Sequence, residues 1–162
     1  MWVLIVSELL VFGAGLMAFL GVRIADPVGF AADQDHLNRV AGAVNTIVLI
    51  TSGYCAARAV HSPGKMRLWL SGSMLLGAVF LVVKWMEYSA KAAQGIDIET
   101  SQFFTFYYLL TGFHAMHVVA GLVIFGLVMR WRNPRNLEAA AMFWHMVDLV
   151  WVLLFPIIYL VR

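Results

Sequence analysis

Five long apolar stretches, each about the length needed to cross a lipid bilayer, dominate this chain of 162 residues. They lie at residues 2–22, 40–60, 68–88, 104–129 and 139–161. A helix needs about 20 mostly apolar residues to cross a hydrocarbon core of about 30 Å. The stretches are unbroken, whereas a transmembrane β-barrel shows alternation over segments of about ten residues. The sequence therefore predicts an all-α, polytopic membrane protein: a single domain of five transmembrane helices.

The composition excludes most soluble functions. Hydrophobic residues make up 62% of the chain and charged residues 12%, whereas an ordinary globular domain is about 25% charged. The net charge is +2 and the basic residues are scattered, so the chain has no basic face for nucleic acid. The single cysteine, Cys55, excludes a disulfide framework and a metal site built from cysteines of this chain.

Basic residues near the ends of the spans predict the orientation, because cytoplasmic loops carry an excess of lysine and arginine. The second and fourth joints carry six of them: Arg58, Lys65, Arg67, Arg130, Arg132 and Arg135. The first and third joints and the C-terminus carry four: Arg23, Arg39, Lys91 and Arg162. The N-terminus is therefore expected in the cytoplasm and the C-terminus in the periplasm. The first joint, with Asp26-Pro27 and the acidic run 33–36, is expected to be a polar connection outside.

Ionisable residues inside the spans are the candidate functional groups. Each costs a few kcal/mol in hydrocarbon and needs a partner or a purpose. They are Glu8, Lys84, Glu87, His114, His117, His145 and Asp148. With a rise of about 1.5 Å per residue, Glu8 and His145 lie roughly 9 Å from the cytoplasmic edge. These depths predict an inner cluster of Glu8, His145 and Asp148 that reaches His117, and an outer cluster of Lys84, Glu87 and His114.

These groups also have structural interpretations. Lys84 and Glu87, three residues apart, can neutralise each other, and the histidines can bond between helices. Asp148 can accept a hydrogen bond from His145 or from an indole. A bis-histidine haem site would need His117 and His145, which the depth estimate separates by about two turns. Glu8 has no polar neighbour on its own helix, which leaves it as a proton carrier or a structural acid.

Small residues in the third and fourth spans predict close helix packing. Ser73 and Gly77 form a small-xxx-small pair, and Gly112, Gly121 and Gly126 thin the fourth span. Such faces suit packing within the chain or docking onto another subunit.

Several segments resemble subunit III of cytochrome c oxidase. Residues 6–12 resemble its I-S-E-x-x-F-F segment, and residues 44–46 resemble its Leu-Asn-Thr segment. Glu87-Tyr88 is similar to its E-Y pair. Residues 111–118 resemble its T-G-F-H-G-x-H-V motif, and residues 143–151 its Y-W-H-F-V-D-V-V-W motif. The segments occur in the family's order and cover nearly the whole chain.

The resemblance implies a non-catalytic subunit that carries no haem or metal, lies beside the catalytic subunit I, binds phospholipid and helps to sustain proton uptake. Glu8 matches the family's buried carbodiimide-reactive glutamate. His114, His117, His145 and Asp148 match its buried polar set, in which no residue ligates a metal. Lys84 stands at a position that is uncharged in the family.

The usual family member has seven helices, and this sequence begins where the third would begin. The family's lipid cleft would then be incomplete, and the five-helix form resembles the NorE-type proteins found with nitric oxide reductase. We therefore expect an accessory subunit of a haem–copper oxidase or nitric oxide reductase in the bacterial cytoplasmic (inner) membrane. Its partner subunit would hold haem and copper or non-haem iron. The alternative is a stand-alone membrane protein that binds haem or quinone and transfers electrons.

Overall fold

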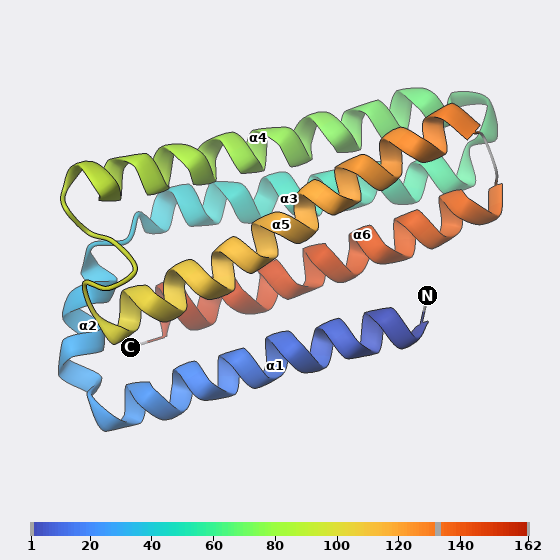
Figure 1. The fold of residues 1–162 in the computed structure, drawn as a ribbon. Helices are drawn as coiled ribbons and strands as arrows, with labels where there is room; N and C mark the ends of the chain where they lie inside the picture. The colour runs from blue at the N-terminus through green and yellow to red at the C-terminus, as the bar shows by residue number, and fades with distance from the viewer. Residues whose placement is uncertain (1, 132–133, 162) are drawn as a thin grey trace.

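The computed structural model describes residues 2–131 and 134–161 as a bundle of long helices. The elements are α1 (Trp2–Ala25), α2 (Pro27–Asp35), α3 (Arg39–His61), η1 (Pro63–Lys65), α4 (Met66–Ala93), α5 (Gln102–Trp131), α6 (Pro134–Phe155) and the π-helical turn η2 (Pro156–Leu160). The five long helices run side by side (Figure 1). Each is long and apolar enough to cross a membrane. This confirms the expected all-α architecture with five spans.

The start of α1 and the end of η2 lie at opposite ends of the bundle (Figure 1). The turn between α3 and α4 lies at the same end of the bundle as the N-terminus (Figure 1). This turn is the second joint of the sequence analysis, which carries Lys65 and Arg67. The predicted orientation rests partly on Arg132 and Arg162, and the predicted fourth joint includes Asn133. These three residues lie outside the described residues. The cytoplasmic assignment of this end stays a prediction.

The first joint is helical rather than an irregular loop. Asp26 caps α2, its carboxylate accepting a hydrogen bond from the Gly29 backbone N–H at 3.0 Å, and Pro27 occupies the first helical position. This order, a capping aspartate followed by proline, is favoured at helix starts. On the buried side of α2, the Gln34 amide donates to the Ile158 carbonyl at 2.8 Å. The short helix therefore closes one end of the bundle and holds the C-terminal segment.

Helix α6 is the centre of the bundle. It contacts α1, α3 and α5. In its most apolar stretch, 56% of the residues are buried inside the bundle, against 22–33% in the other four spans. Helix α1 is peripheral and packs mainly on α5 and α6. The spans also exceed the expected lengths, since α4 has 28 residues and α5 has 30. At about 1.5 Å per residue, both are longer than a hydrocarbon core of about 30 Å.

Small residues let the indole of Trp144 pass between neighbouring helices. A Cβ on Gly121 would lie 2.5 Å from Cε3 of Trp144, and a Cβ on Gly77 would lie 2.7 Å from its Cη2. The indole Nε1 donates to the Ser52 hydroxyl at 3.0 Å, and that hydroxyl donates to the Ser73 carbonyl at 2.8 Å. Three of the small residues singled out in the sequence, Ser73, Gly77 and Gly121, therefore serve packing within the chain.

Candidate functional site

Lys84 is the centre of a buried polar cluster that joins α4, α5 and η2. Its ammonium donates to a Glu87 carboxylate oxygen at 2.9 Å and to the hydroxyls of Tyr159 at 3.0 Å and Tyr107 at 3.2 Å. The Tyr159 hydroxyl donates in turn to Glu87 at 2.9 Å. An ammonium group has three protons to donate, and here each has an acceptor. The lysine charge is therefore both neutralised and fully hydrogen-bonded.

Aromatic rings enclose the same ammonium. Its nitrogen lies 4.9 Å from the ring centres of Tyr88 and Tyr107, and 5.4 Å from that of Trp151. Such rings attract a cation by their quadrupole. Further along α4, the Lys91 ammonium donates to the His36 carbonyl at 2.9 Å. Tyr107 and Tyr159, which accept from Lys84, were not recognised in the sequence, because an aromatic residue in an apolar helix has no distinctive spacing.

His114, expected beside Lys84 and Glu87, bonds to a different element. Its Nε2 lies 3.1 Å from the Val147 carbonyl of α6. The rings of Phe80 and Trp151 pack on the imidazole, which is fully buried. Among the described residues it forms no hydrogen bond with Lys84 or Glu87, so it joins α5 to α6 rather than completing the outer cluster.

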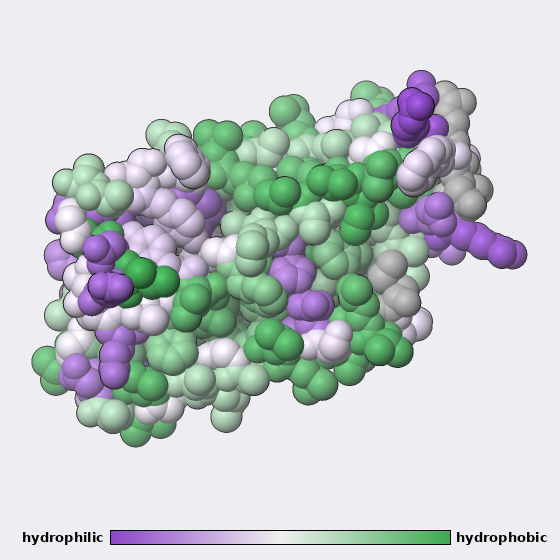
Figure 2. Space-filling model, viewed as in Figure 1, coloured by the Kyte–Doolittle hydropathy of each residue, from purple (hydrophilic) through white to green (hydrophobic). Residues whose placement is uncertain are grey.

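Glu8 and His117 meet between α1 and α5. A Glu8 carboxylate oxygen lies 3.0 Å from Nε2 of His117, and the other ring nitrogen lies 2.9 Å from the Phe113 carbonyl. The pair is incompletely covered, since 24% of the Glu8 side chain and 14% of the His117 side chain are exposed. Figure 2 shows a small hydrophilic spot within apolar surface where α1 runs beside α5. A polar pair thus opens towards the lipid-facing side of the bundle.

His145 and Asp148 lie at a different interface, against Gly53 of α3. A Cβ on Gly53 would overlap the Asp148 carboxylate and would lie 3.5 Å from Nδ1 of His145. The expected inner cluster is therefore divided. Glu8 meets His117 between α1 and α5, whereas His145 and Asp148 lie beside Gly53 of α3. The indoles of α6 do not donate to Asp148, because Trp151 donates to Thr46 at 3.0 Å and Trp144 to Ser52.

No group of three or more histidine, cysteine, aspartate or glutamate side chains within residues 2–131 and 134–161 is placed to hold a metal ion. The sequence model of one family, described as cytochrome c oxidase subunit III, matches residues 1–161. The chain belongs to the cytochrome c oxidase subunit III family. Subunit III is a non-catalytic subunit of a haem–copper oxidase.

Similar proteins come from several bacteria. Cytochrome c oxidase subunit 3 of Corynebacterium diphtheriae is 34% identical over 99% of this chain and 86% of its own length. The probable cytochrome c oxidase subunit 3 of Nocardia farcinica is 33% identical over 96% of this chain and 84% of its own. The subunit 3 of Thermostichus vulcanus is 30% identical over 98% and 84%. The similarity therefore extends along the whole bundle.

The segments that resemble subunit III contact one another in the structure. Glu8 of the first segment reaches His117 of the 111–118 segment. The Tyr88 hydroxyl lies 2.6 Å from that of Thr111, in the same segment. Trp151, at the end of the 143–151 segment, donates to Thr46. Residues of the subunit III motifs thus form polar contacts between helices, and these contacts hold the helices in place relative to one another.

Proposed function

We propose that this chain is a structural subunit of a bacterial haem–copper oxidase, seated in the cytoplasmic membrane beside the catalytic subunit I. The match to subunit III along residues 1–161 carries the proposal. The five spans supply the membrane location, and the basic residues favour a cytoplasmic N-terminus and a periplasmic C-terminus. Because the relatives are named as oxidase subunits, an oxidase is favoured over a nitric oxide reductase as the partner complex.

Purification of the tagged chain from its membrane in mild detergent tests this function. We expect a large subunit with oxidase haem spectra to co-elute, and we expect the chain purified alone to show no Soret band. A Soret band in the isolated chain would favour the stand-alone electron-transfer protein. Co-elution with a nitric oxide reductase catalytic subunit would replace the oxidase as the partner.

We further propose that Glu8 and His117 hold a proton near the flank of the catalytic subunit. The Glu8 carboxylate oxygen and the His117 Nε2 lie 3.0 Å apart, close enough for the two groups to share a proton. Their partial exposure leaves a route for exchange with a group outside the bundle.

The Glu8→Gln variant of the intact complex tests this proton-holding role. We expect turnover to slow, or inactivation during turnover to speed up, by several-fold with unchanged haem spectra, because glutamine keeps the shape but cannot ionise. Ser7→Ala is the matched control, since the neighbouring Ser7 is exposed and bonds only within α1. Turnover and inactivation equal to wild type in Glu8→Gln would leave Glu8 as a purely structural acid.

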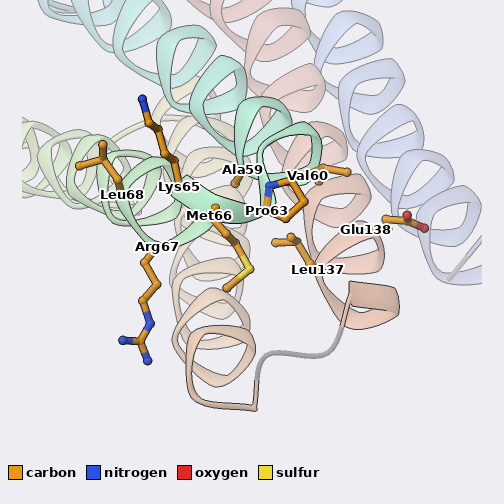
Figure 3. A pocket seen from close by; sticks show the side chains of 10 residues that line it. Ala59, Val60, Pro63, Lys65, Met66, Arg67, Leu68, Leu137 and Glu138 are labelled. Carbon is orange, nitrogen blue, oxygen red and sulfur yellow. The ribbon is translucent and has the colours of Figure 1, made fainter.

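We also propose a phospholipid site at the end of the bundle where α3 turns into α4. A pocket of about 580 Å³ there is lined by Val60, Met66 and Leu137, with Lys65 and Arg67 in its wall. Figure 3 shows Met66 and Leu137 turned towards the pocket, while Lys65 and Arg67 extend to opposite sides. Apolar walls suit an acyl chain, and cations at a membrane surface attract anionic headgroups, each by about 1 kcal/mol.

Replacement of both cations tests the lipid site. In the Lys65→Gln/Arg67→Gln variant, we expect the purified chain to retain several-fold less phosphatidylglycerol, measured by mass spectrometry of the extracted lipid. Retention of phosphatidylcholine should be unchanged, because the apolar walls are intact. Equal retention of phosphatidylglycerol by variant and wild type would remove the pocket as an anionic lipid site.

A further inference from the structure

Helix α6 exposes one narrow stripe of side chains, although it is the central helix of the bundle. From residue 142 to the end of α6, the stripe consists of Met142, His145, Leu149, Val152 and Leu153, whose spacing places them on one helix face. All but His145 are apolar, as a lipid-facing surface requires. His145 is the exception, an exposed imidazole in an apolar stripe.

The imidazole lies too deep for water or lipid headgroups to cover it. The apolar stretch of α6 begins at residue 139, and a rise of about 1.5 Å per residue places His145 roughly 9 Å inside it. That depth lies within a hydrocarbon core of about 30 Å. Acyl chains offer no hydrogen-bonding group at this depth, so a polar side chain facing them is unfavourable.

A second unpartnered group lies directly beneath. Asp148 is 8% exposed, and its Oδ1 has no hydrogen-bond partner among the described residues. Gly53 provides the space that this carboxylate occupies, since any side chain there would overlap it. His145 likewise forms no hydrogen bond within the described part of the chain. Asp148 Oδ1 is itself enclosed, so the His145 imidazole is the group of the two that is open to a partner from outside.

Other ionisable groups of the spans face neighbours within the chain. Lys84 and Glu87 bond to each other, and Lys91 donates to a backbone carbonyl. Glu8 lies within ion-pair distance of His117, although its Oε2 makes no hydrogen bond among the described residues. The His145 imidazole differs from these groups because it is exposed on an apolar face of a membrane-spanning helix. A polar group in that position needs a partner that reaches it from outside this chain.

We propose that the stripe of α6 centred on His145 and Asp148 is the docking face for a transmembrane helix of another subunit. That helix covers the His145 imidazole and brings it a neutral hydrogen-bonding group, such as a hydroxyl or an amide, within the hydrocarbon region. A second copy of this chain fits less well, because a two-fold contact would bring two Asp148 carboxyl groups to the same interface. The inference rests on the proposed function, since it needs a partner subunit.

Site-specific photo-crosslinking in the complex purified from its membrane tests the docking face. A photoreactive amino acid replaces Leu149, which is 48% exposed within the stripe, or Leu75 on α4, which is 67% exposed, as the control. We expect the probe at position 149 to crosslink a different subunit and the probe at position 75 to react with lipid. A crosslink to lipid or to a second copy from position 149, or to the other subunit from position 75 alone, overturns the proposal.

A substitution of the imidazole gives an independent readout. His145→Leu should weaken association with the partner subunit roughly threefold, about the size of one hydrogen bond between membrane helices, measured as the dissociation constant in detergent. Met142→Leu, on the same stripe, should leave it unchanged. Because position 145 is exposed, the unfolding midpoint of the isolated chain should stay at the wild-type value in both variants.

The two possible failures are distinguishable. Unchanged association in His145→Leu, with the oxidase subunit still co-eluting, overturns the docking face and leaves the proposed function intact. The absence of any co-eluting haem-bearing subunit from the wild-type chain overturns the proposed function and the docking face together.

Discussion

Replacing Lys84 with methionine will lower the stability of the bundle by about 3–5 kcal/mol, the usual cost of breaking a buried ion pair on one side. The substitution keeps the apolar stem but removes the cation, so the Glu87 carboxylate remains buried without its counter-charge. The hydroxyls of Tyr107 and Tyr159 lose the donor that they now accept from. Thermal unfolding of the purified chain in detergent measures the loss.

The double variant Lys84→Met/Glu87→Gln is the decisive control, because it removes both charges at once. Replacing a buried ion pair by neutral groups of similar shape is often close to neutral. The double variant should therefore recover most of the stability that the single variant loses, and this non-additivity measures the coupling. Tyr107→Phe, which removes one neutral hydroxyl, should cost only about 1 kcal/mol. A double variant no more stable than Lys84→Met would contradict the pairing.

The Lys84 cluster also accounts for a departure from the family pattern. A lysine stands where the resemblance to subunit III leads to an uncharged residue, and a lone charge there would be unfavourable in hydrocarbon. The structure supplies three oxygen acceptors from three separate elements, α4, α5 and η2. Through its hydrogen bond to Tyr159, the Lys84 ammonium therefore also joins the C-terminal turn η2 to α4.

Helix count and family were accessible from the sequence because each rests on a local signal. Apolar length alone located the five spans, and the motif around His114 and His117 indicated subunit III. The start of α2 had a local signal too, in Asp26-Pro27, but a polar connection was expected there. The polar residues of this joint favoured a loop, but the structure forms the short helix α2 there, with Phe30 and Gln34 on its buried side.

The pairing of side chains between helices was not accessible in the same way. Depths were counted from the predicted ends of the spans, yet α5 has 30 residues and extends past the ends of a hydrocarbon core of about 30 Å. His117 was therefore expected only at the deep end of the inner cluster, although it lies 3.0 Å from Glu8. For Lys84, the charge predicted only that acceptors were needed; Tyr107 and Tyr159 lie 23 and 75 residues further along the chain, and no local pattern pointed to them.

Replacing Gly121 with alanine will destabilise the bundle by about 1–3 kcal/mol, the typical cost of overpacking a filled interior. The added methyl carbon would lie 2.5 Å and 2.6 Å from two carbons of the Trp144 ring. That ring is fully buried, and a Cβ on Gly77 of α4 would also meet it. Because the indole is rigid and has close neighbours on both α4 and α5, α5 and α6 must separate to admit the methyl group. The midpoint of thermal unfolding in detergent measures the effect.

Gly126, five residues further along α5, provides the matched control. A Cβ there would have no atom within 4 Å, so Gly126→Ala adds a methyl group to open space. Alanine is favoured over glycine inside a helix by roughly 0.5–1 kcal/mol, and this variant should be as stable as wild type or more so. The two substitutions are chemically identical and occur in the same helix, so intrinsic helix propensity cannot explain a difference between them. Equal unfolding midpoints for the two variants would show that the indole of Trp144 does not fill the space beside Gly121.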